Sequence, residues 1–230
     1  HTKSRAWFDR ALQVIPSGVY GHLGPSEGLF LPLEKWPLLS SKAKGAYFWD
    51  LDGNPYLDLM CAYGPNVLGY GDPDVDRAAM EQLMAGNCTT APSYKMVECA
   101  ELLVDTVAMA DWAFFMKNGT DATTFSILPA TFSILTARAF TGKKKTMFLR
   151  GYYHGNDPWA MKADYPGVLP EEVANNLVVP WFDLPAMEAA YDACGGDVAA
   201  LIAQPYDHGN FADNRCATKE FWASVRQFCD

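Results

Sequence analysis

Short apolar runs alternate with helical patterns along the second half of the chain, and this alternation restricts the fold more than any other feature. Three runs have the length of a β-strand, namely 113–116, 146–149 and 198–203. Apolar residues at helical spacing lie between and after them, at 120–140, 184–194 and 217–228. Buried strands that alternate with helices are typical of a parallel sheet covered by helices on both faces. The sequence therefore predicts an α/β fold with a mostly parallel sheet.

The first sixty residues show three different patterns. Residues 4–15 have apolar side chains at helical spacing, which predicts an N-terminal helix. The stretch 16–44 is rich in glycine, proline and serine and shows no clear period, so we expect an irregular arm. Residues 46–59 read as two strands around an Asp-Gly-Asn turn at 52–54, which predicts a β-hairpin.

Two more helices are predicted between the hairpin and the first apolar run. Asp72-Pro73 begins one of them, because aspartate caps a helix well and proline suits its first position. The second spans about 93–107. We accordingly expect a helix and arm over 1–44 and a large domain over 45–230.

Composition and charge limit the classes of function. Hydrophobic residues make up 50% of the 230 residues, enough for a substantial core. The net charge of −9 gives no broad attraction to nucleic acid or to an anionic membrane, although backbone dipoles can still bind a small anion. The six cysteines contain no C-x-x-C pair, which favours reduced thiols in a cytoplasmic protein without a metal site. The first ten residues contain no apolar h-region, so we expect no signal peptide. No apolar run reaches the ~18 residues that a membrane span needs, so we expect no membrane span.

A possible anion site follows the first apolar run, at Asn118-Gly119-Thr120. Glycine after a strand allows a tight turn, and the N–H groups at the start of the next helix then point outward towards an anion. Thr120 adds a hydroxyl donor, whereas the charge of Asp121 would repel a phosphate if it pointed inward. Taken alone, the tripeptide is weak evidence for an anion site, and an ordinary helix cap is the favoured interpretation.

The helix predicted after this turn contains a repeated segment. Five residues, T-F-S-I-L, occur at 124–128 and again at 131–135. An insertion of seven residues is nearly two helical turns and almost preserves the buried face, but Pro129 would kink or break the helix. We interpret the repeat as a local duplication, natural or introduced in the recorded sequence, and an intact mass decides between them.

Ordered motifs along nearly the whole chain resemble the class III pyridoxal-phosphate (PLP) aminotransferases, and most closely their glutamate-1-semialdehyde aminomutase branch. The motifs are I-P-S-G-V at 15–19, G-A-Y-F-W-D-L-D-G-N-P-Y-L-D at 45–58, G-P and L-G-Y-G-D-P within 64–73, K-N-G-T-D-A-T at 117–123, A-R-A-F-T-G at 137–142, G-Y-Y-H-G at 151–155 and I-A-Q-P at 202–205. The resemblance implies the PLP-transferase fold type I. It also implies a homodimer that acts on an amine or amino acid and a keto compound.

The resemblance assigns a role in PLP binding to six residues. Gly119 and Thr120 hold the phosphate, and Asn118 stands where the family has a serine. Tyr153 matches the aromatic residue that stacks on the cofactor ring, and His154 supports the same pocket. A sixth residue, Asn210, aligns with an asparagine near the ring hydroxyl.

The chain departs from the family in two respects. The Schiff-base lysine and the aspartate that pairs with the ring nitrogen lie beyond residue 230 in the family, as does the small C-terminal domain. The chain therefore resembles the N-terminal part only, and its catalytic lysine is not assigned. The stretch 20–24 also lacks the arginine that binds the aminomutase substrate, and Gln204 replaces a glutamate. Both differences favour an aminotransferase for another amine or amino acid over the aminomutase itself.

Other functions remain as alternatives. One is a non-catalytic subunit or fragment with the PLP fold. Another is a haloacid-dehalogenase-type phosphatase, in which Asp50 of the D-L-D-G-N stretch would attack phosphorus. A calcium loop starting at the same aspartate lacks its bidentate glutamate, because Cys61 occupies that place.

Overall fold

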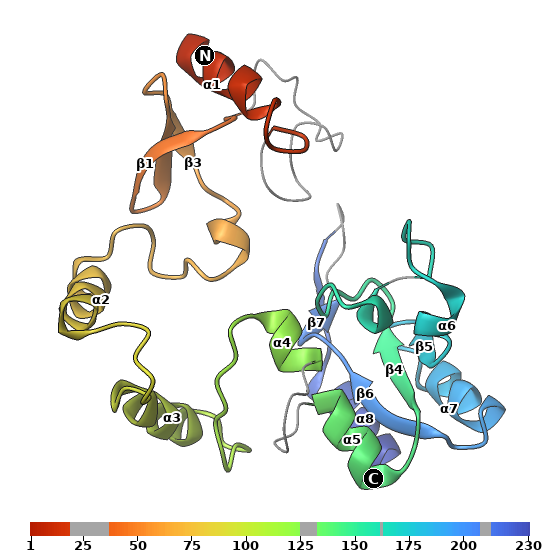
Figure 1. Ribbon diagram of the computed structural model, residues 1–230. Helices are drawn as coiled ribbons and strands as arrows, with labels where there is room; N and C mark the ends of the chain where they lie inside the picture. The colour runs from red at the N-terminus through yellow and green to blue at the C-terminus, as the bar shows by residue number, and fades with distance from the viewer. Residues whose placement is uncertain (19–36, 125–132, 162, 208–212) are drawn as a thin grey trace. The chain divides into compact units, whose positions relative to one another are not determined.

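The computed structural model describes residues 1–18, 37–124, 133–161, 163–207 and 213–230 (Figure 1). These residues form two compact units, His1–Met96 and Val97–Asp230. Each unit has its own sheet. The division predicted at residues 44 and 45 stays a prediction.

The first unit is built on a small antiparallel sheet of order β1-β2-β3. Its elements are α1 (Thr2–Ala11), β1 (Ser40–Lys44), β2 (Tyr47–Asp50), β3 (Pro55–Leu57), the short helix η3 (Cys61–Tyr63), α2 (Pro73–Ala85) and α3 (Lys95–Thr106), which ends in the second unit. The hairpin predicted around residues 52–54 is confirmed as β2 and β3. The added strand β1 lies in the stretch expected to be irregular, and it pairs with β2 through a register shift.

Asp50 organises the turn of this hairpin from a fully buried position. Its carboxylate accepts hydrogen bonds from the N–H groups of Asp52 (2.9 Å) and Asn54 (2.8 Å) and from the Asn54 side-chain amide (2.7 Å). The Tyr56 hydroxyl also donates to it, at 3.2 Å. Burial by itself raises the pKa of the Asp50 carboxyl, but these hydrogen bonds outweigh it and hold the pKa below its ordinary value. A carboxylate enclosed in this way is a structural group, not the exposed nucleophile that a phosphatase requires.

The helices α2 and α3 confirm the two helices predicted between the hairpin and the first apolar run. The Asp72 carboxylate caps α2 by accepting the N–H groups of Asp74 and Val75, at 3.0 and 3.1 Å. Pro73 occupies the first helical position, where its missing N–H costs nothing. Across the described ranges, no helix is long and apolar enough to cross a membrane.

The second unit contains the predicted parallel sheet, with the order β5-β4-β6 (Figure 1). Its strands are β4 (Lys145–Leu149), β5 (Asn176–Val179) and β6 (Val198–Ile202), followed by the antiparallel pair β7 (Tyr206–Asp207) and β8 (Arg215–Cys216). Its helices are α4 (Gly119–Thr124), α5 (Ser133–Thr141), η4 (Pro158–Ala160), α6 (Pro170–Val173), α7 (Leu184–Ala193) and α8 (Lys219–Cys229). Strands β4 and β6 confirm two predicted runs, whereas β5 was not anticipated.

The core of this unit lies between the sheet and the helices α7 and α8. It consists of six buried side chains: Met147, Leu149, Val179, Trp181, Met187 and Val225. Strand β4 is buried over its last four residues, as expected for the middle strand of a covered parallel sheet. This rigid strand leads directly into residues 151–156.

Two expectations differ from the structure or fall outside it. The run 113–116 was predicted to be a strand, and that is wrong: it belongs to no ladder in the described part of the chain. An apolar run forms a strand only where a neighbouring strand satisfies its backbone, and Phe114 is 65% exposed here. The helix predicted over 120–140 is described only as α4 and α5. Residues 125–132, with most of the repeated segment, lie outside the described residues, so the duplication stays a prediction.

Candidate cofactor site

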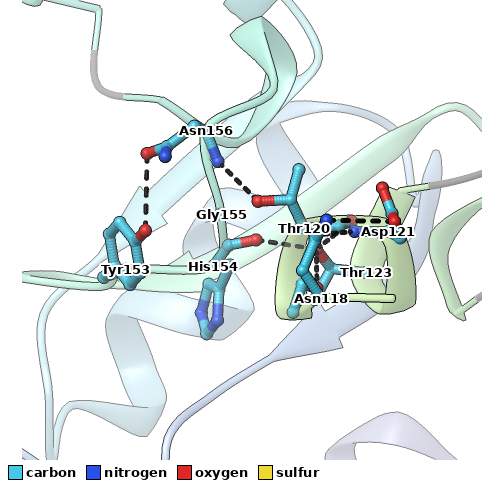
Figure 2. A pocket seen from close by; sticks show the side chains of 9 residues that line it. Asn118, Thr120, Asp121, Thr123, Tyr153, His154, Gly155 and Asn156 are labelled. Carbon is cyan, nitrogen blue, oxygen red and sulfur yellow. Dashed lines mark hydrogen bonds between the residues drawn. The ribbon is translucent and has the colours of Figure 1, made fainter. Parts of the chain in front are cut away.

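A cavity of about 580 Å³ lies between the start of α4 and the loop that follows β4 (Figure 2). Its size is in the range of small-molecule sites, about 300–1,000 Å³. The residues that line it come from two segments: Asn118, Gly119, Thr120, Asp121, Thr123, Tyr153, His154, Gly155 and Asn156. The loop begins at the carboxyl end of a parallel strand, which is where α/β proteins commonly bind ligands.

The first segment is the turn that begins α4. Asn118 caps the helix, because its Oδ1 accepts the N–H of Asp121 at 2.9 Å. The N–H groups of Gly119 and Thr120 precede the first helical hydrogen bond and have no acceptor among the described residues. Two backbone donors are therefore available to an anion at the positive end of the helix.

Two hydrogen bonds fasten this turn to the second segment. The Asn156 N–H donates to Thr120 Oγ1 at 3.1 Å, and Thr123 Oγ1 donates to the His154 carbonyl at 2.7 Å. Because Thr120 Oγ1 serves as an acceptor here, its own hydroxyl hydrogen stays available to a ligand. The two bonds bring together segments that are more than thirty residues apart in sequence.

Gly155 permits this close approach. Its φ of +109° is unfavourable for side chains, and a Cβ there would lie 2.7 Å from Thr120 Oγ1 and 2.9 Å from Thr120 Cα. Any larger residue would push the loop and the turn apart. The glycine is thus a condition for the shape of the cavity.

Tyr153 presents an aromatic face at the other end of the cavity. The side chain is 65% exposed, and its hydroxyl donates to Asn156 Oδ1 at 3.4 Å. Figure 2 shows the ring on the loop, across the cavity from α4. An exposed ring fixed at its hydroxyl can stack on a flat ligand.

His154 points into the protein and lies against other rings. Its imidazole stacks on Tyr152, with ring centroids 5.5 Å apart, and lies 5.7 Å from the Phe148 ring. Burial lowers the pKa of this imidazole, so the ring is neutral at neutral pH. Its Nε2 atom is buried and has no hydrogen-bond partner among the described residues. Such an atom is expected to have a polar partner in the complete site.

The structure brings five of the six predicted site residues to this one cavity: Asn118, Gly119, Thr120, Tyr153 and His154. The sixth, Asn210, lies outside the described residues. The roles assigned to all six stay predictions. Sequence reasoning gave no role to Thr123 and Asn156, which make the fastening hydrogen bonds. Thr123 lies one helical turn after Thr120, and that spacing is the one hint the sequence offered.

The lining residues suit a phosphorylated aromatic cofactor. Backbone and hydroxyl donors meet at the turn, as a phosphate requires, and an exposed aromatic ring faces them across the cavity. The buried Nε2 of His154, which has no partner among the described residues, can make one further hydrogen bond. The donor set therefore fits PLP, with a phosphate at the turn and a ring beside Tyr153.

The comparison with known proteins identifies the family. The sequence profile of the family Aminotransferase class-III matches residues 32–230. The chain therefore belongs to the class III aminotransferases, a family that uses PLP.

Two named relatives narrow the comparison. The chain is 38% identical over 229 residues to an aminopentol aminotransferase of Sphingopyxis macrogoltabida, covering 100% of this chain and 51% of that protein. It is 32% identical over 213 residues to a glutamate-1-semialdehyde 2,1-aminomutase of Anaeromyxobacter dehalogenans strain 2CP-1, covering 88% of this chain and 47% of that protein. The chain thus spans about half the length of the curated relatives it matches.

Solved structures agree with this assignment. The FumI protein of Sphingopyxis sp. MTA144, in its PLP internal aldimine form, superposes with a TM-score of 0.89 and 38% identity over 100% of this chain and 53% of that one. A glutamate-1-semialdehyde aminomutase of Pseudomonas aeruginosa PAO1 superposes with a TM-score of 0.77 at 24% identity, over 99% of this chain and 49% of that one. The second likeness shows a shared fold. The described units therefore have the mixed α/β fold of type I PLP aminotransferases over about half its length.

Proposed function

We propose that the protein is a PLP-dependent aminotransferase that moves an amino group between an amine or amino acid and a carbonyl compound. One observation supports this most: the anion-binding turn and an exposed tyrosine, far apart in sequence, line one cavity in a class III chain. When bound, PLP supplies an electron sink that allows amino groups to be transferred. The proposal concerns the whole protein, because the chain spans about half the length of the curated relatives it matches.

The residues of the chain bind and orient the cofactor in this proposal. The N–H groups of Gly119 and Thr120 and the Thr120 hydroxyl donate to phosphate oxygens. The Tyr153 ring fixes the plane of the cofactor and thereby the direction of the bond to be broken. His154 is proposed to support the same pocket as a neutral imidazole, and Asn210 is proposed to lie near the ring hydroxyl.

The substrate is proposed to be an amine other than glutamate-1-semialdehyde. The relative at 38% identity is named for an aminopentol, whereas the aminomutase of Anaeromyxobacter dehalogenans strain 2CP-1 is 32% identical. The stretch 20–24 also lacks an arginine to bind a substrate carboxylate. The keto partner is a small carbonyl compound. A homodimer and a cytoplasmic location are proposed together with this function.

The test is PLP binding and amine transfer by the purified full-length protein, with Tyr153→Ala as the informative variant. The expected result is a yellow protein that transfers amino groups from an amine to a keto acid. Loss of the stacked ring weakens PLP binding about three- to tenfold, as the energy of aromatic pairs predicts. Tyr165→Ala serves as the control, because Tyr165 is similarly exposed but does not line the cavity.

The binding measurement is a PLP titration followed by visible absorbance and by amine turnover. A wild-type protein that binds no PLP would contradict the proposal. If PLP binding is weakened equally in the Tyr153 and Tyr165 variants, only the proposed role of Tyr153 is contradicted, and the proposed function is not.

A further inference from the structure

The proposed phosphate site contains an acidic side chain close to where an anion must bind. Among the described residues that line the cavity, Asp121 is the one carboxylate, and none is a lysine or an arginine. Like charges at short range repel. Phosphate binding at Gly119 and Thr120 therefore depends on the direction in which this carboxylate points.

The Asn118 side chain controls that direction with both ends of its amide. Its Oδ1 accepts the Asp121 N–H at 2.9 Å, and its Nδ2 donates to Asp121 Oδ2 at 3.0 Å. Figure 2 shows Asp121 on the far side of the turn from Tyr153, joined to Asn118 by these bonds. The carboxylate is thus bound to the cap of its own helix, away from the face of the cavity where the cofactor ring is proposed.

The same cap leaves the neighbouring donors untouched. Asn118 takes the N–H of the third helical residue, Asp121, and none from the first two residues, Gly119 and Thr120. One side chain therefore forms hydrogen bonds with the acidic residue and leaves the N–H groups of Gly119 and Thr120 available to an anion. A residue that only capped the helix would need no donor directed at the carboxylate.

We propose that Asn118 is a positioning residue for the cofactor phosphate and acts through Asp121. It holds the Asp121 carboxylate out of the phosphate site, so that the N–H groups of Gly119 and Thr120 meet the phosphate without a competing charge. This inference rests on the proposed PLP function. It assigns to Asn118 an indirect action in place of direct contact with the phosphate.

The test compares the binding of PLP with that of pyridoxal, which has the same ring and no phosphate. Asn118→Ala is made in the full-length protein with Asp121 present and again together with Asp121→Asn. Dissociation constants for both ligands are measured by absorbance titration. Thermal melting of each variant confirms that it is folded.

With Asp121 present, Asn118→Ala is expected to weaken PLP binding about tenfold, because the released carboxylate can turn towards the phosphate. Binding of pyridoxal changes by less than about twofold, since it carries no phosphate charge. In the Asp121→Asn background, Asn118→Ala changes PLP binding by less than about twofold as well, because no charge remains to be held.

Two results overturn the inference while leaving the proposed function intact. If Asn118→Ala weakens PLP equally in the Asp121→Asn background, Asn118 acts directly on the phosphate or only as a cap. If pyridoxal is weakened as much as PLP, the effect is a general loss of structure. A wild-type protein that binds neither ligand overturns the proposed function itself, and the inference with it.

Discussion

At the scale of single residues, a carboxylate in the hairpin turn caps a helix 49 residues away in sequence. Asp52 accepts the N–H of Lys3 at 2.8 Å and that of Ser4 at 2.9 Å, two donors that α1 cannot satisfy by itself. These backbone hydrogen bonds, that of Ser4 first, lower the pKa of the Asp52 carboxyl to about 2. One side chain therefore fastens the N-terminal helix to the first sheet.

The attachment of α1 is expected to depend on pH in the acid range. Because the folded pKa of Asp52 is lower than its ordinary 3.8, its contribution is complete above that value and is lost as pH falls towards about 2. The protection of the Lys3 and Ser4 amides, which is their exchange rate compared with the intrinsic rate at the same pH, should therefore fall over this range. In Asp52→Asn, this protection should be lower already at neutral pH and nearly constant from pH 4 to 2.

Asp9→Asn is the matched control for this prediction. Asp9 is an exposed carboxylate of α1 itself, paired with Arg5 and remote from the cap. It should leave the exchange of both amides and its acid dependence unchanged. Equal protection of Lys3 and Ser4 in wild type and Asp52→Asn would show that the cap does not hold α1.

At the scale of elements, the cavity depends on how closely the loop after β4 approaches α4. Gly155→Ala would place a Cβ within 3 Å of Thr120 at a φ of +109°. The backbone strain costs about 1–2 kcal/mol, and the clash with Thr120 adds to it. PLP binding is expected to weaken at least about tenfold, because the turn and Tyr153 no longer face each other at the right distance.

Gly167→Ala separates the effect of backbone strain from the effect of the clash with Thr120. Gly167 also has a positive φ, +89°, but a Cβ there would meet nothing within 4 Å. Thermal melting should show a loss of stability in both variants, while a PLP titration should show weaker binding for Gly155→Ala alone. Unchanged PLP binding in Gly155→Ala would mean that the approach of the loop to the turn does not shape the site.

The elements that were predicted correctly contain local sequence signals that favour their formation. Asp72-Pro73 caps α2, and the Asp-Gly-Asn turn forms the hairpin. Strand β5 was missed because it has only four residues, between Asn175 and Pro180, and so short a run looks like part of a loop until β4 pairs with it. The run 113–116 failed for the opposite reason: its apolar pattern is strong, but a strand also needs a partner.

The candidate site was also predicted only where the sequence carries a local signal. Its five described residues could be named from motifs, because a turn and an aromatic loop have recognisable sequence patterns. The hydrogen bonds of Thr123 and Asn156 that join the turn to the loop could not be predicted, because they depend on how two distant segments meet. The engagement of Asp121 by Asn118 likewise needed side-chain geometry.

At the scale of the whole molecule, an acidic chain is proposed to bind a phosphorylated cofactor. The net charge of −9 would repel anions at long range. Backbone donors at one turn can overcome this repulsion locally, because they act within a few ångströms and need no net positive charge. We therefore expect affinity for PLP to be a property of the cavity, whose described lining residues all belong to the second unit.

A crystal structure of the full-length protein with PLP tests the central claim most directly. The phosphate oxygens should lie about 2.7–3.2 Å from the backbone nitrogens of Gly119 and Thr120, with the cofactor ring against the face of Tyr153. Asp121 should remain joined to Asn118. PLP bound elsewhere, or with its phosphate away from this turn, would contradict the account.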